Sequence, residues 1–112
     1  LWFTLRFTDT IQHEEIMENL YSSEFLMATE KMSSNKVFSF GRDHGYHGRL
    51  LSHGIVAEQS LHVKDNVLTG YCFTPQDGNA LLSSVAGTVQ HYYKDNWTEK
   101  MKTFNRYIFK NI

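Results

Sequence analysis

The sequence contains little cysteine and little proline. Cys72 is the single cysteine among the 112 residues, so no internal disulfide and no zinc site built on several cysteines can form. A lone thiol is typical of a reducing compartment, and we therefore expect a cytoplasmic protein. Pro75 is the single proline, and no Gly- or Ser-rich stretch resembles a linker. We expect one domain covering residues 1–112.

The chain also lacks a net charge of either sign and a long hydrophobic run. Its formal net charge is −1 at pH 7, so we expect no nucleic-acid partner. No apolar run approaches the ~18 residues that a membrane helix needs, so we expect no membrane partner. Two basic and six acidic residues give −4 over residues 1–32, and five basic and two acidic residues give +3 over residues 94–112. Both charge runs alternate with apolar residues at helical spacing, which indicates solvated helix faces.

The apolar residues are numerous enough for a core, at 41% of the chain with 14% aromatic. Alternation over residues 1–8 predicts a strand, with Phe3, Leu5 and Phe7 on one side. We expect a helix over residues 10–32, interrupted or kinked at Ser22–Ser23, and a short strand over residues 36–40. Residues 55–63 and 67–73 indicate a hairpin whose turn takes its positive φ at Asn66.

The second half of the chain is predicted to be helical. Thr74 and Pro75 begin a helix that runs to about Lys94. Its apolar residues recur at the three-and-four spacing that is typical of a helix, and they are Leu81, Leu82, Val85, Val89 and Tyr92. Gly87 is expected to face a close neighbour. Residues 97–110 favour a final helix, although residues 104–109 also alternate as a strand would.

These elements predict an α+β fold. We expect a single-layer antiparallel or mixed sheet flanked by three helices, similar to a profilin-like or longin-like layout. If the last segment is a strand, the order becomes the ferredoxin-like β-α-β-β-α-β. Neither topology implies a function.

Residues 41–54 form the stretch richest in candidate chemistry, because they combine four glycines with three histidines. The imidazoles of His44, His47 and His53 could bind zinc or another transition metal, although their spacing matches no established motif and we expect no cofactor. The same stretch could hold an anion or act as an acid–base site, through Arg42, Asp43, Tyr46 and Arg49. Cys72 is expected to be buried and inert rather than nucleophilic.

Aromatic residues near the C-terminus exceed what two helices can bury, and such residues often contact partners. The candidate contact residues are Tyr92, Tyr93, Tyr107 and Phe109. We therefore expect a non-catalytic interaction or regulatory module that binds a protein partner or itself through aromatic helix faces. The alternative is a small enzyme or a ligand- or metal-binding domain with its site in residues 41–54.

Overall fold

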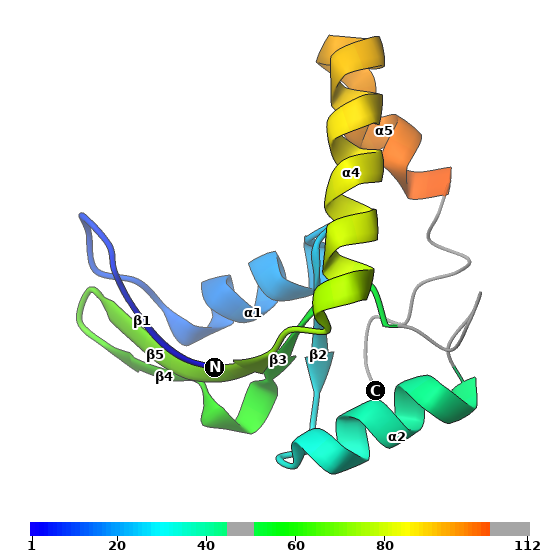
Figure 1. Cartoon of the computed structure of the whole chain (residues 1–112). Helices are drawn as coiled ribbons and strands as arrows, with labels where there is room; N and C mark the ends of the chain where they lie inside the picture. The colour runs from blue at the N-terminus through cyan, green and yellow to red at the C-terminus, as the bar shows by residue number, and fades with distance from the viewer. Residues whose placement is uncertain (45–50, 104–112) are drawn as a thin grey trace.

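A mixed five-stranded sheet flanked by helices forms the body of the protein (Figure 1). The computed structural model describes residues 1–44 and 51–103. The elements in chain order are β1 (Trp2–Arg6), α1 (His13–Ser22), β2 (Leu26–Thr29), α2 (Ser34–His44), β3 (Gly54–Ala57), the 3₁₀ turn η1 (Glu58–Ser60), β4 (His62–Lys64), β5 (Val67–Phe73), α4 (Gln76–Tyr93), the 3₁₀ turn η2 (Lys94–Asn96) and α5 (Trp97–Met101). The predicted α+β class, with one sheet and flanking helices, is confirmed.

Strand β5 lies at the centre of the sheet. The strand order is β1-β5-β3-β2. Along the edge of β5 opposite β1, β4 pairs with the first residues of β5 and β3 pairs with its last residues. Only the β2–β3 pair is parallel, because α2 crosses between those two strands. Because α2 lies between β2 and β3, the order of the elements differs from the ferredoxin-like β-α-β-β-α-β order, which was the alternative prediction.

The predicted hairpin forms between β4 and β5, but its first arm, expected over residues 55–63, is divided into β3, η1 and β4. The turn also differs from the prediction. Val63 pairs with Leu68 and Lys64 pairs with Val67, which leaves a two-residue turn. Asp65 has the positive φ, 56°, where we predicted Asn66. The Asn66 side chain instead donates from Nδ2 to the Phe7 carbonyl oxygen at 2.7 Å, and the Phe7 N–H donates to the Asn66 carbonyl oxygen at 2.8 Å. The turn is thereby joined to the end of β1.

Two sequence predictions are wrong in the first half of the chain. The expected helix over residues 10–32 ends at Ser22, and residues 26–29 form β2. The break lies at the suspected serine pair, where the Ser23 hydroxyl accepts the Phe25 N–H at 3.1 Å. The expected strand over residues 36–40 lies inside α2, because a short apolar run fits a helix as well as a strand.

Each face of the sheet has its own hydrophobic cluster, as expected where side chains alternate along buried strands. On one face, Met27, Ile55 and Phe73 pack against Val37 of α2. On the opposite face, Ala28 and Val56 pack against Leu20 of α1. The two helices therefore cover opposite faces of the sheet (Figure 1).

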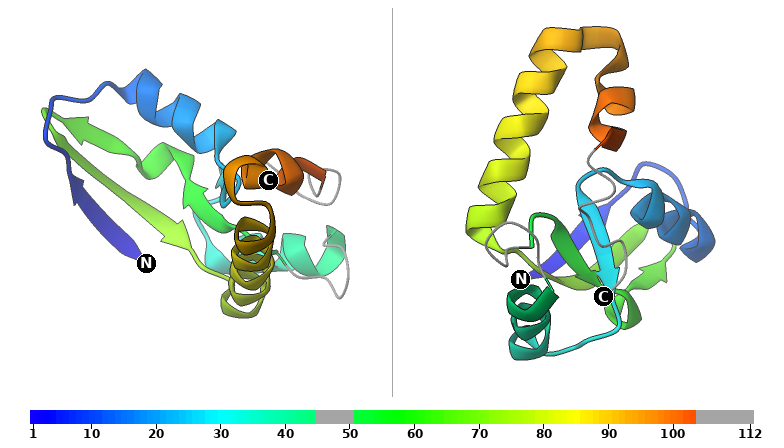
Figure 2. Two further views of the ribbon diagram at one scale, coloured as in Figure 1. Left: turned by 90° about the horizontal axis from the view of Figure 1, so that it is seen from above. Right: turned by 90° about the vertical axis from the view of Figure 1, so that its right-hand side faces the viewer.

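Helix α4 is attached to the sheet through its first turn and then extends away from it. Figure 2 (right) shows α4 rising above the sheet, with α5 folded back beside it. Asn79 Nδ2 donates to the Ser52 carbonyl oxygen at 2.8 Å. A Cβ atom at Gly78 would collide with the Leu51 carbonyl oxygen, so the helix can approach this backbone only because position 78 is glycine. Gly87, predicted to face a close neighbour, has no atom near its Cβ direction.

The glycines of α4 provide a matched test of this attachment. Gly78→Ala should lower the free energy of unfolding by about 1–3 kcal/mol, since an added methyl group overpacks the contact with Leu51. Gly87→Ala should instead raise it by about 0.4–1 kcal/mol, because the substitution only restricts the unfolded chain. Urea denaturation followed by circular dichroism measures both. Equal effects of the two substitutions would contradict the described contact.

Candidate functional site

The stretch 41–54 is divided between different elements. Residues 41–44 form the last turn of α2, and residues 51–53 lead into β3, which begins at Gly54. Tyr46, His47 and Arg49 lie outside the described residues. The glycine content suggested one continuous loop, but residues 41–44 belong to helix α2 instead.

Arg42 and Asp43 form an ion pair with each other at the surface. Arg42 Nε donates to Asp43 Oδ1 at 2.9 Å, and both side chains are exposed. The hydrogen bond to Asp43, and then its negative charge, raise the pKa of Arg42 above its ordinary value. The Arg42 guanidinium is therefore already paired with the neighbouring Asp43 carboxylate.

His44 and His53 lie in different environments. The exposed His44 donates from Nδ1 to the Phe40 carbonyl oxygen at 3.2 Å, and its ring stacks on the Phe40 ring with centroids 4.4 Å apart. His53 is only 1% exposed, and a hydrogen bond of 2.9 Å joins its Nδ1 to Ser52 Oγ. His53 thus belongs to the packed entry to β3.

No metal site is assembled by the part of the chain that the structure describes, in which no three His, Cys, Asp or Glu residues cluster closely enough. Because His47 is outside that part, the three-histidine site stays a prediction, as does an enzyme or ligand site in residues 41–54. Cys72 is partly buried on the sheet face that α1 covers, beside Val56.

The aromatic residues at the end of α4 are exposed. Tyr92 is 78% exposed and Tyr93 is 42% exposed, with their rings in an edge contact at 5.0 Å. Lys100 Nζ of α5 lies 5.1 Å from the centre of the Tyr93 ring, within the range of a cation–π interaction. Tyr107 and Phe109, the other two candidates, are outside the described residues.

The exposed apolar surface extends along α4 beyond the tyrosines. Leu81 is 60% exposed and Val85 is 39% exposed. At 100° per residue, Leu81, Val85 and Tyr92 fall within roughly 40° of one another around the helix axis. We call these three residues the outer stripe. They recur with Leu82 and Val89 at the spacing typical of one side of a helix, but the residues that α4 buries are Gly78 and Ala86.

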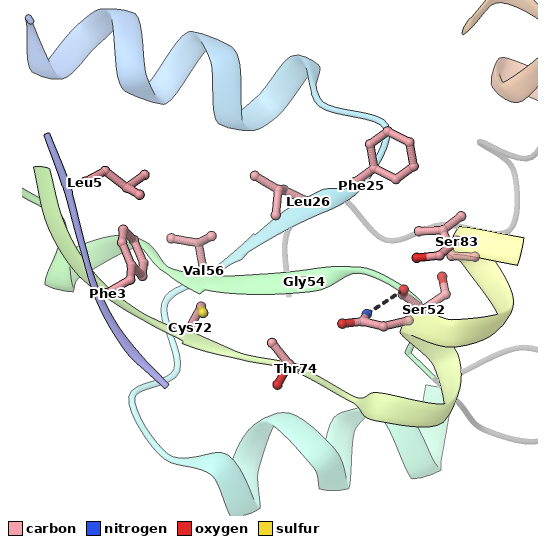
Figure 3. Close-up of a pocket in the computed structure, with 12 residues that line it drawn as sticks. Phe3, Leu5, Phe25, Leu26, Ser52, Gly54, Val56, Cys72, Thr74 and Ser83 are labelled. Atoms are coloured by element: carbon pink, nitrogen blue, oxygen red, sulfur yellow. Dashed lines mark hydrogen bonds between the residues drawn. The ribbon is translucent and has the colours of Figure 1, made fainter. Parts of the chain in front are cut away.

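A second feature, which the sequence interpretation missed, is an apolar groove on the sheet face that α1 partly covers (Figure 3). Its volume is about 420 Å³. Phe3 and Leu5 of β1, Leu26 of β2, and Val56 of β3 line it, and the first turns of α4 close one end. The alternation of Phe3 and Leu5 was the available signal, but the position of β1 beside β5 was not predictable from it.

Comparison with known proteins adds no relative: the sequence matches no family model and no curated protein. Within residues 1–44 and 51–103, none of the helices is both long enough and apolar enough to cross a membrane. The geometry described above is therefore the basis for assigning a function.

The two described histidines of the 41–54 stretch can be distinguished by their effect on stability. His53→Ala should lower the free energy of unfolding by at least about 2 kcal/mol, because it removes a buried side chain and one hydrogen-bond partner. His44→Ala should cost less than about 1 kcal/mol, because the side chain is exposed. Urea denaturation of the two variants gives the comparison. A His53→Ala protein as stable as His44→Ala would contradict the buried position.

Proposed function

We propose that the protein is a non-catalytic interaction module that associates with a second copy of itself through the outer stripe of α4. The observation that carries the proposal is the exposure of Leu81, Val85 and Tyr92 on one side of a helix that extends beyond the sheet. A solvated helix face normally carries polar or charged side chains.

The charge distribution of α4 supports an interface. Between Asp77 and Lys94 the chain contains no Asp, Glu, Lys or Arg. Depletion of charge is typical of the core of a protein–protein interface, where aromatic residues such as tyrosine are enriched. A stretch of this length without Asp, Glu, Lys or Arg on a largely exposed helix is unusual for a surface that contacts only water.

The pairing that we propose is antiparallel, between identical α4 helices. In a pairing centred on the stripe, Leu81 of one copy faces Tyr92 of the other. A two-fold arrangement of this kind uses the same surface on both copies. In this arrangement the dipoles of the two helices point in opposite directions, which favours the pairing.

Small side chains flank the outer stripe on one side and would allow the two helices to approach closely. Ala80 and Ser84 are both exposed there, next to Leu81 and Val85 in the helical wheel. Packed helices lie about 8–10 Å apart, and small residues at the contact favour the lower end of that range.

Sedimentation velocity over a range of protein concentrations tests the proposal. The unmodified protein should convert from monomer to dimer as its concentration rises. Leu81→Glu combined with Val85→Glu should abolish the dimer, because two charges would be buried without partners. Tyr92→Ala should weaken association at least about tenfold, as expected when a large aromatic contact is removed from an interface.

Met32→Glu is the matched control, because Met32 is also an exposed apolar residue but lies between β2 and α2, away from α4. It should leave the dimer unchanged. A protein that is monomeric at every concentration, or a Leu81→Glu, Val85→Glu variant that dimerises normally, would overturn the proposal.

A further inference from the structure

A hollow between the sheet and α4 is distinct from the outer stripe and has no role in the proposed pairing. We propose that this apolar groove binds a small, elongated, uncharged molecule that has an aliphatic or aromatic body and a hydroxyl or carbonyl group at one end. The proposal rests on the shape of the groove, the absence of charged side chains among the described residues that line it, and the placement of its polar side chains (Figure 3).

The groove is built on the sheet itself. Val56 of β3 and Cys72 of β5 are paired neighbours and form its floor. Gly54 contributes no side chain to that floor, and its Cβ direction points to Leu26 Cδ2 at 3.0 Å. Along β1, Phe3 lies over Gly70, where a Cβ atom would come within 2.7 Å of Phe3 Cζ. The two glycines therefore set the depth and the wall of the groove.

The hollow continues beneath α1. A second space of about 310 Å³ is lined by Leu20 of α1 and by Leu61 and Leu68, and it shares four lining residues with the first. The shared residues are Phe3, Leu5, Leu26 and Val56. The two spaces adjoin along the sheet face, so the site is longer than it is wide and suits an extended molecule.

The polar groups of the groove are neutral and gather at the end next to α4. In the first space they are Ser52, Thr74, Asn79 and Ser83, and Figure 3 shows Ser52 and Ser83 beside α4 with Thr74 between them and Cys72. The second space adds Asn19 and Ser23, which are also neutral. The amide of Asn79 is held by its bond to the Ser52 carbonyl oxygen, which leaves Oδ1 as an acceptor. These groups can exchange hydrogen bonds with a hydroxyl or carbonyl, and the remainder of the groove can hold an apolar chain.

No Asp, Glu, Lys, Arg or His lines either space among the described residues. A charged ligand would lose its hydration here without gaining an ion pair, and this loss disfavours carboxylates and amines. An uncharged ligand loses much less hydration free energy when it enters the groove. The chemical class of the occupant therefore follows from the lining.

The size of the groove favours a small molecule over a helix of a second copy. A helix about 10 Å in diameter occupies roughly 400 Å³ per turn, so the main space would hold about a single turn. Ligand sites for small molecules commonly measure about 300–1,000 Å³ and are mainly apolar with a few converging polar groups. The groove fits that description.

Binding of decan-1-ol, compared with decanoate and decylamine of the same chain length, is the direct test. Trp97 contacts Phe25, which lines the groove, with ring centroids 6.1 Å apart, so tryptophan fluorescence can report occupancy. Decan-1-ol should bind with 1:1 stoichiometry and at least about tenfold more tightly than either charged compound. Isothermal titration calorimetry gives the stoichiometry independently.

Two variants and a control locate the binding. Cys72→Phe fills the floor and should weaken decan-1-ol binding at least about tenfold. Leu26→Lys, at the exposed rim, should weaken decan-1-ol binding but strengthen decanoate binding, a reversal that unfolding cannot produce. Leu81→Ala on the outer side of α4 should leave both affinities unchanged.

The proposal is overturned if decan-1-ol shows no saturable binding, or if decanoate binds as tightly as the alcohol. It is also overturned if Leu26→Lys changes the sedimentation of the protein and leaves decan-1-ol binding unchanged, because the groove would then be an interface between copies.

Discussion

The contact between the first turn of α4 and the backbone at Leu51–Ser52 determines where both candidate surfaces lie. Gly78 allows the close approach, and Asn79 fixes it with a hydrogen bond to the Ser52 carbonyl oxygen. From this one attachment the first turns of α4 close the end of the sheet groove. The rest of the helix, which carries the outer stripe, extends away from the sheet, as the ribbon in Figure 2 shows. A larger residue at position 78 would displace both surfaces together.

The sheet explains why one side of the protein is left open. Strands β2 and β3 bury side chains on both faces, and α2 covers one of them. On the opposite face α1 reaches only part of the surface, so the apolar side chains of β1 are not fully covered. The groove therefore exists because the short helix α1 covers the sheet incompletely. The described residues that line it carry no charge because the strands alternate and turn their apolar side chains toward the core.

Part of this fold was predictable from local signals. The hairpin of β4 and β5, the start of α4 after Pro75, and the class of the sheet all follow from turn, proline and alternation patterns. Strand β2 was mistaken for helix because Leu26 to Thr29 is a short apolar run without a distinguishing period. The exposed side of α4 was also unpredictable, since Leu81 and Leu82 are equally apolar and only tertiary packing decides which is covered. The groove depends on β1 pairing with β5, far along the chain.

The central claim is that the outer stripe of α4 is a surface for a second copy of the chain. Amide hydrogen exchange, measured at a low and at a high protein concentration, tests this claim most directly because it locates the protected residues. We predict that exchange slows at the higher concentration for residues 81–92 and stays constant in β3 and β5. Exchange in α4 that is the same at both concentrations, or concentration-dependent protection confined to the sheet, would contradict the account.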